Sequence, residues 1–400
     1  MSQFSSICIR CIFSMLFLLP LASRAQDPVF SQYFNQKLYL NPAFTGYEPG
    51  LVFSSGFRNQ WRSVANGQGR YLTNHLELSQ ELASATSGNS GVGIGISYTD
   101  NAEGEGLYNA LGSNTGLLRW QRSTVSFGWH NWACNIDDSP IGISLGFEGA
   151  HNRYVMDWQN FTFGDQLDPI YGTVRNTNVP IPDGGISGTT FYDVSAGGII
   201  HFNQDRHRLY RLGFAAHHIV LQNNSPNGFD DRLPMRFTLH GTGILHRYDK
   251  GAIQNLWQFN PTFRVDLQQA ASGISARQNG QVSPFWHALF STGFAVKTPG
   301  LTRLTAGAWY QGSTPLNVSP AYRQGIHSVQ FYGALEQIQQ PRSGYAGFTY
   351  ELGFSWNHNL GAARSLGDIF EFSLTINLPS TAALGFGCQN CMIRHVINQF

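Results

Sequence analysis

The chain has 400 residues, of which 42% are hydrophobic, 14% are aromatic and only 12% are charged. This charged fraction is about half the usual one and excludes an ordinary soluble surface, while a formal net charge of +1 excludes a strongly basic nucleic-acid-binding face. A mean hydropathy of -0.20 excludes a bundle of membrane-spanning helices, and 44 glycines are typical of a β-sheet that meets lipid on one face.

Residues 1–25 have the pattern of a secretory signal peptide. Arg10 gives a weakly positive start, residues 12–22 form an apolar run, and Ala25 is a small residue at the expected cleavage site. An uncleaved anchor helix is the alternative, but the run is shorter than the ~20 apolar residues that a spanning helix needs. We therefore predict export by the Sec route and a mature chain that begins at Gln26.

Residues 26–50 form an aromatic-rich, nearly uncharged segment that includes the sequences DPVFSQYF and LYLNPAFTG. Such a segment is too apolar to extend freely into water. We expect it to pack against the periplasmic rim or into the interior of the fold that follows, and a docking segment for a partner protein is the alternative. Its candidate contact residues are Phe30, Tyr33, Tyr39, Asn41, Pro42, Phe44 and Gly46.

Alternation of large apolar residues with small or polar ones runs through residues 51–378. In residues 92–98, for example, Val92, Ile94 and Ile96 alternate with Gly and Ser. The mature chain has no run of 18 apolar residues, and an exported chain without a spanning helix crosses a membrane only as a closed barrel. The second face carries Gly, Ser, Thr and Asn instead of solvating Lys and Glu, which indicates a lumen. The pattern predicts an all-β, transmembrane outer-membrane β-barrel.

About 14 antiparallel strands are expected, an even number as in single-chain bacterial barrels. They are residues 51–58, 70–79, 91–99, 122–131, 141–149, 192–202, 210–219, 235–245, 257–267, 288–297, 303–311, 326–334, 347–356 and 369–378. The connectors after odd-numbered strands are mostly the longer ones, which places both termini in the periplasm. Residues 150–191 then form a large extracellular loop.

Charged residues of both signs fall on the lumen face. They are Glu148, Asp193, Arg236, Arg264, Asp266, Glu351 and Glu371. A ring of one sign would indicate an ion-selective pore, whereas mixed signs predict a paired polar network. His201, His217 and His240 also fall on or near this face, but the histidines and serines share no motif or zinc-ligand spacing. No catalytic residue, metal site or cofactor is therefore predicted.

Residues 379–400 follow the last strand and are predicted to be a periplasmic C-terminal tail. Cys388 and Cys391 would lie in an oxidising compartment, so we expect either a disulfide between them or a bond from one of them to a partner. Cys134 is the third candidate for such a bond. A metal or redox pair is a further alternative, although two thiols alone do not complete a zinc site.

Several stretches of the chain resemble the PorP/SprF family of the type IX secretion system. The most specific are DPVFSQYF, LYLNPAFTG and the FRNQW sequence at residues 57–61. The resemblance continues through YDVSAGG, LGFAAHHI, LPMRFTLHGTGIL, YAGFTYELGFSW and GDIFEFSLTINL, and so spans the mature chain. The CQNC sequence of the tail departs from the family pattern, which leaves the role of the tail open.

The resemblance implies a non-enzymatic outer-membrane protein of a Bacteroidota-type bacterium. It would assist the secretion or cell-surface anchoring of cargo that carries a type IX C-terminal sorting domain, as gliding-motility adhesins do. Implied partners are that cargo, periplasmic secretion-ring or peptidoglycan-binding components, and outer-membrane lipid, with no nucleic acid.

The main alternative function is a fatty-acid-type uptake channel for hydrophobic compounds. That class also has about fourteen strands, and its N-terminal plug contains Asn-Pro-Ala, which residues 41–43 match. Uptake would require an apolar pocket in the lumen, whereas the alternation places Gly, Ser and charge there. An outer-membrane lipid hydrolase is a third class, which an assay on phospholipid or ester substrates would distinguish.

Overall fold

The structure is a computed structural model. It describes residues 27–48, 50–63, 69–84, 90–104, 118–131, 141–158, 167–168, 172–173, 176, 178, 181, 184–205, 208–220, 233–246, 257–269, 276–278, 281–283, 286–315, 326–339 and 348–378. The predicted signal peptide, Cys134, and the tail with Cys388 and Cys391 lie outside the described residues.

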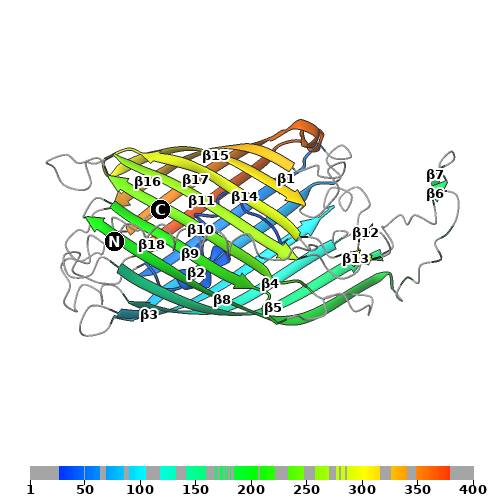
Figure 1. Cartoon of the computed structure of the whole chain (residues 1–400), viewed down its shortest axis with the longest axis horizontal. Coiled ribbons are helices and arrows are strands. Elements are labelled where there is room, and N and C mark those ends of the chain that lie inside the picture. The colour runs from blue at the N-terminus through cyan, green and yellow to red at the C-terminus, as the bar shows by residue number, and fades with distance from the viewer. Residues whose placement is uncertain are drawn as a thin grey trace.

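Fourteen strands close into a single barrel (Figure 1). They are β1 (Leu51–Gln60), β2 (Tyr71–Ser84), β3 (Ser90–Glu103), β4 (Leu118–Asn131), β5 (Ile141–Asp157), β8 (Ile186–Asp205), β9 (Arg208–His217), β10 (Arg236–His246), β11 (Gln258–Gln269), β14 (Trp286–Lys297), β15 (Thr302–Pro315), β16 (Ile326–Gln339), β17 (Phe348–Leu360) and β18 (Ile369–Leu378). Each pairs antiparallel with its neighbour in the chain, and β1 closes the ring on β18 with Leu51 opposite Leu378. The predicted fold class is confirmed.

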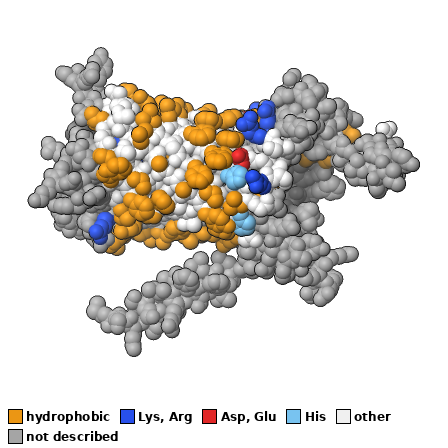
Figure 2. Space-filling view, turned by 90° about the horizontal axis from the view of Figure 1, so that it is seen from above, with side chains coloured by type: hydrophobic (Ala, Val, Ile, Leu, Met, Phe, Trp, Pro, Cys, Tyr) orange, Lys and Arg blue, Asp and Glu red, His pale blue; other side chains and the backbone are white. Residues whose placement is uncertain are grey.

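The barrel wall has an apolar outer face and a small or polar inner face. In β5, Ile141 and Phe147 are exposed on the outside, while Ser144 and Glu148 are buried inside. The hydrophobic side chains cover the middle of the barrel, and the Lys and Arg side chains in view lie toward its ends (Figure 2). This distribution is that of a barrel immersed in lipid. Among the described residues, no helix is long and apolar enough to cross a membrane.

The strands extend further than the apolar alternation predicts. The predicted loop 150–191 is too long, because β5 continues to Asp157 and β8 already begins at Ile186. In this extension of β5, Asn152 is buried and points inward, while Arg153 is exposed on the outer face. Because outward residues of this extension are polar, a pattern of apolar residues does not detect it as a strand. Beyond the wall, two short hairpins pair β6 (Leu167–Asp168) with β7 (Gly172–Thr173) and β12 (Ala276–Gln278) with β13 (Gln281–Ser283).

The two ends of the barrel differ in their connectors. The longer ones include residues 158–185 and 218–235, and we call their end the outer end; it also carries the 3-10 helix η7 (Gly361–Leu366). The opposite, inner end has short connectors such as 206–207 and 298–301, and it holds the start of β1 and the end of β18. Since short turns face the periplasm in bacterial outer-membrane barrels, we propose that the inner end faces the periplasm.

Residues 27–48, which we call the plug, lie inside the barrel (Figure 1). They contain the one-turn helix α2 (Lys37–Leu40) and the 3-10 helix η1 (Pro42–Phe44). Every plug residue is buried except Val29 and Lys37, which are half-buried. The plug begins beside the outer end, where Asp27 meets His218, and ends near the start of β1.

Candidate functional site: the plug and the lumen wall

The inner half of the plug, residues 41–46, lies directly against glycines of the wall. A Cβ atom on Gly93 would lie 2.3 Å from Gly46 Cα, one on Gly128 2.1 Å from the Thr45 carbonyl oxygen, one on Gly146 2.2 Å from the Pro42 carbonyl carbon, and one on Gly197 2.0 Å from Asn41 Oδ1. Side chains never approach backbone this closely, so a larger residue at these positions would displace the plug. These glycines therefore make room for the plug. The alternation in the sequence shows only that the lumen face carries small residues, and does not show that a segment packs against them.

Asn41 and Pro42 explain the shape of the plug at this point. The Asn41 side chain accepts a hydrogen bond of 2.9 Å from the Ala43 N–H and so caps η1, which begins at Pro42. The Asn41 amide also donates to the carbonyl oxygens of Gly198 and Phe214, both at 3.3 Å, and lies 3.1 Å from His240 Nε2. One side chain thus both shapes η1 and attaches it to the wall.

Two carboxylates of the wall bind backbone N–H groups of the plug. Glu371 accepts hydrogen bonds of 2.7 and 2.8 Å from Ser31 and Gln32. Glu77 accepts from Lys37 and Leu38, both at 3.0 Å, at the start of α2. These N–H groups have no partner within a helical turn, and an ionised acceptor makes the bond stronger than a neutral one would.

Three plug tyrosines each lie beneath an arginine of the wall. The guanidinium carbon is 5.6 Å from the ring centroid for Arg264 over Tyr33, 5.2 Å for Arg236 over Tyr39, and 5.3 Å for Arg211 over Tyr47. Each phenol also has a hydrogen-bond partner, which is Thr262 for Tyr33, the Pro28 carbonyl for Tyr39 and His201 for Tyr47, all at 2.8 Å. Burial raises the pKa of Tyr33 and of Tyr39 to about 12, so both phenols stay neutral. The cation–π contacts bind the plug without burying another charge.

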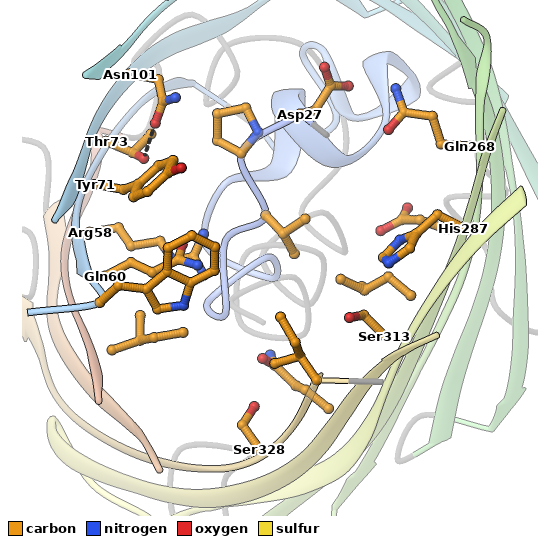
Figure 3. Close-up of a pocket in the computed structure, with 18 of the residues that line it drawn as sticks. Asp27, Arg58, Gln60, Tyr71, Thr73, Asn101, Gln268, His287, Ser313 and Ser328 are labelled. Atoms are coloured by element: carbon orange, nitrogen blue, oxygen red, sulfur yellow. Dashed lines mark hydrogen bonds between the residues drawn. The ribbon is translucent and has the colours of Figure 1, made fainter. Parts of the chain in front are cut away.

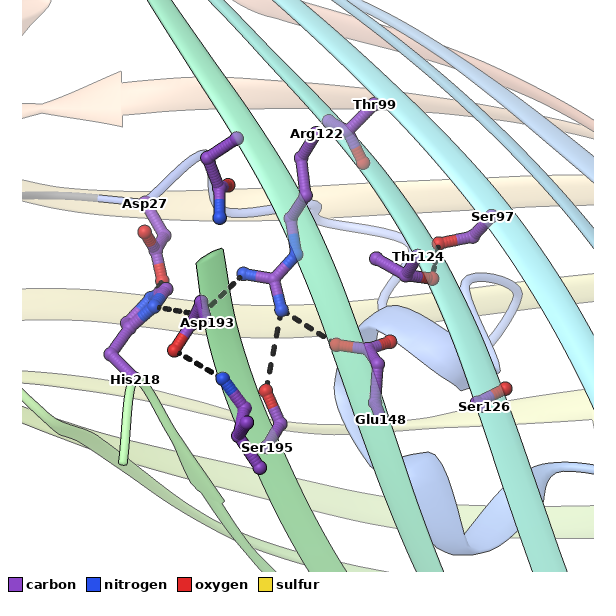
Figure 4. A network of polar contacts seen from close by, with 12 residues as sticks. Asp27, Ser97, Thr99, Arg122, Thr124, Ser126, Glu148, Asp193, Ser195 and His218 are labelled. Atoms are coloured by element: carbon purple, nitrogen blue, oxygen red, sulfur yellow. Dashed lines mark hydrogen bonds and ion pairs between the residues drawn. The ribbon is translucent and has the colours of Figure 1, made fainter. Parts of the chain in front are cut away.

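The first residue of the plug is held by an ionic cluster (Figure 4). Asp27 lies 2.8 Å from His218 Nε2 and 2.7 Å from Arg236, and His218 Nδ1 lies 2.6 Å from Asp193. Burial alone would raise the pKa of Asp27, but the charges of His218 and Arg236 outweigh it and hold that pKa well below its ordinary value. Burial would lower the pKa of His218, but Asp27 and Asp193 outweigh it and raise that pKa. Both shifts favour the charged forms of the two groups.

The seven charged lumen residues named from the sequence are all buried, in several groups. Glu148, Asp193 and Arg236 lie in or beside the cluster around Asp27, with Arg122 2.6 Å from Glu148. Arg264 pairs with Asp266 at 2.7 Å, Glu351 with Lys297 at 3.2 Å and Glu371 with Arg58 at 2.9 Å. They form ion pairs and clusters that each touch or adjoin the plug.

Sequence analysis missed several residues that hold the plug. Arg122 lies on β4 between Gln121 and Ser123, where no apolar alternation marks the strand, and Asp27 belongs to a segment that is notable for its aromatic residues and not for its few charges. β9 ends at His217, and a φ of 59° turns the next residue, His218, inward, which strand alternation does not predict. An inward-facing glycine row opposite an Asn-Pro sequence is the signal that could have placed the inner half.

The plug separates two spaces in the lumen. At the outer end a cavity of about 340 Å³, the outer cavity, lies beside Asp27, Pro28 and Val29 (Figure 3). Its lining combines charged and amide residues, among them Arg58, Glu103, Arg236, Asp266 and Gln268, with apolar residues such as Val29, Leu289 and Ile326. At the inner end a recess of about 40 Å³ lies beside Lys37, which pairs with Glu48. Within the described residues, no group of three or more His, Cys, Asp or Glu side chains is placed to hold a metal ion.

Comparison with known proteins confirms the family resemblance over the N-terminal part of the chain. The family model described as type IX secretion system membrane protein PorP/SprF matches residues 22–115. No curated protein matches the chain. Similar solved structures include a Pseudomonas aeruginosa FadL homologue, with 9% identity, a TM-score of 0.42 and coverage of 82% of this chain and 89% of that chain. Another is the Pseudomonas putida toluene transporter TodX, with 11% identity, a TM-score of 0.43 and coverage of 90% and 96%.

Proposed function

We propose that this barrel, whose residues 22–115 match the PorP/SprF family, assists the secretion or surface anchoring of type IX cargo. The family match supports the broader role of an outer-membrane component of the type IX secretion system. The proposed cargo carries a C-terminal sorting domain, as gliding-motility adhesins of Bacteroidota-type bacteria do. Further proposed partners are periplasmic secretion-ring or peptidoglycan-binding components and outer-membrane lipid.

The observation that carries the proposal is the content of the matched stretch. Residues 22–115 include the whole plug and β1 to β3, so they hold both sides of the Gly46–Gly93 contact and of the Glu77 bonds to α2. The stretch that matches the family thus includes the plug, which fills the lumen, and the strands that the plug contacts. A filled lumen suits a barrel that holds a partner at the membrane surface better than one that conducts a solute.

The uptake channel is less well supported. Such a channel needs an apolar pocket for its ligand, whereas charged and amide side chains such as Arg58, Glu103 and Gln268 lie among the apolar residues that line the outer cavity. Below that cavity the plug fills the lumen, since Asn41 to Gly46 are buried against the wall.

A non-enzymatic role, Sec export with cleavage after Ala25, and a disulfide at Cys388 and Cys391 remain parts of the proposal.

The test is a plug variant in which Tyr39, Pro42 and Phe44 are all replaced by Ser. None of these side chains faces lipid, so heat-modifiable migration and the outer-membrane level should stay near wild type. Surface display of the cognate cargo should fall. As a control, Ile141, Ile143 and Leu145, which point outward from β5, are replaced by Val. If the plug variant displays cargo normally, or if deletion of the protein abolishes growth on a hydrophobic nutrient but leaves surface proteins in place, the secretion role is wrong.

A further inference from the structure

One wall of the outer cavity carries an aromatic pair beside a carboxylate. Trp61 directly follows β1, and its ring lies 4.7 Å from that of Tyr71 at an interplanar angle of 79°. Tyr71 stands opposite Glu103 in the pairing of β2 with β3, and all three side chains line the cavity. Trp61 has a φ of 61°, which a bulky residue adopts only when its surroundings impose it.

Glu103 differs from the other acidic residues of this cavity. Asp27 is paired with His218 and Arg236, and Asp266 with Arg264. For Glu103, the contact that the described residues supply is a hydrogen bond of 3.2 Å from the Asn101 amide, and none of their cations pairs with it. A half-buried carboxylate gains most from a cation that arrives with a ligand.

Two hydrogen-bond donors of the cavity are also unused. Trp61 Nε1 and Gln268 Nε2 are both buried and have no hydrogen-bond partner within the described part of the chain. The whole Gln268 side chain is nine-tenths buried, and it lies across the cavity from Tyr71 and Asn101 (Figure 3). Buried donors are almost always satisfied in folded proteins, so these two are available to acceptor atoms of a ligand.

We propose that the outer cavity binds a polypeptide segment through one of its lysine or arginine side chains. The cation lies against the faces of Trp61 and Tyr71 and pairs with the Glu103 carboxylate. Carbonyl oxygens of the segment accept hydrogen bonds from Trp61 Nε1 and Gln268 Nε2. A volume of about 340 Å³ admits a side chain and its adjoining backbone but not a folded domain. This inference does not depend on the secretion role, because it concerns the purified barrel alone.

The test is a binding titration with two fluorescein-labelled peptides, Gly-Ser-Lys-Ser-Gly and the same sequence with Gln for Lys. Wild-type protein in an uncharged detergent should bind the Lys peptide at least about tenfold more tightly, and added salt should weaken that preference. Glu103→Gln should reduce Lys-peptide affinity about tenfold or more, and Trp61→Leu about threefold or more. Asp100→Asn is the matched control, since Asp100 lies on β3 outside the cavity lining and pairs with Arg119.

Three results of the titration itself would overturn the proposal. They are equal affinity for both peptides, Glu103→Gln affinity equal to wild type, and an Asp100→Asn loss as large as that of Glu103→Gln. Competition by methylammonium at the same concentration as the peptide would mean that the amine alone is recognised, which also refutes a peptide site. Heat-modifiable migration shows whether each variant folds. If Glu103→Gln does not fold, the peptide preference and its salt dependence in the wild-type protein decide the question.

Discussion

The two halves of the plug are held by different kinds of interaction. The outer half, from Asp27 to Gln32, is bound by charges: the cluster around His218 and the Glu371 carboxylate. The inner half, residues 41–46, is bound mainly by shape, because its backbone fills space that the wall glycines leave open. Charged contacts respond to pH and salt, whereas a steric fit does not. One segment can therefore be loosened at its outer half while its inner half stays in place.

The largest effect is expected from Glu371→Leu, which breaks the charged attachment of the outer half. It removes the acceptor of the Ser31 and Gln32 N–H groups and leaves Arg58 buried without its partner. Loss of one partner of a buried pair costs about 3–5 kcal/mol of stability. The temperature at which the heat-modifiable band shifts should drop clearly. Adding Arg58→Met should recover part of the loss, and a double variant no better than the single would contradict this account.

Gly146→Ala should have a smaller effect, confined to the inner half. The new methyl group would lie 2.2 Å from the Pro42 carbonyl carbon, and overpacking of this kind costs about 1–3 kcal/mol. Conductance in planar bilayers should rise as the inner half leaves the wall. Gly149 is on the same strand and has nothing within 4 Å of its added Cβ, so Gly149→Ala is the matched control. Equal behaviour of the two variants would show that the glycine fit does not hold the plug.

A change of pH should loosen the outer half alone. Because the pKa of Asp27 is lowered, its stabilising contribution is full above the ordinary value of 3.8 and is lost as the pH falls through its lowered pKa. Because the pKa of His218 is raised, its contribution is full below 6.5 and is lost as the pH rises through its raised pKa. The outer half should therefore be bound most tightly between pH 3.8 and pH 6.5, where both contributions are full.

Amide hydrogen exchange, followed by mass spectrometry, measures this directly. Peptides covering residues 30–35 should exchange faster at alkaline pH, after correction for the intrinsic rate, than peptides covering 42–47. His218→Gln should remove the difference. Uniform loosening along the plug would contradict the distinction between the halves.

The smallest effects are expected from two single hydroxyl groups of the plug. Tyr39→Phe removes the bond to the Pro28 carbonyl, and Tyr47→Phe removes the bond to His201, while both rings stay beneath their arginines. Each should lower stability by about 1 kcal/mol, as for a typical hydrogen bond. Chemical denaturation would measure both, and Tyr192→Phe, at an exposed tyrosine of the outer face, is the control.

The barrel could be predicted from sequence because its signal is local. Each strand shows its own alternation, so fourteen strands and the direction of their faces follow from short windows such as residues 141–147. The strand ends could not be placed, since outward residues such as Arg153 are polar beyond the lipid.

The contacts of the plug could not be predicted in the same way. Ser31 and Glu371 are 340 residues apart, and no short pattern in the chain relates them. The segment was recognised from its apolar content, but its attachment to particular glycines and carboxylates depends on how the whole ring closes. Trp309 illustrates the limit: it belongs to an alternating strand, yet it points inward and stacks on Phe34 at 5.0 Å.

The position of Glu371 has a consequence for the order of assembly. It lies on β18, the last strand of the barrel in chain order, which both closes the ring against β1 and binds the N–H groups of Ser31 and Gln32. A closed wall leaves little room for 22 buried or half-buried residues to enter afterwards, so we expect the N-terminal segment to be in place before β18 zips onto β1. The plug can then be fixed only once β18 has been added to the barrel. We expect a chain that ends before β18 to insert with its plug unbound and exposed to periplasmic proteases.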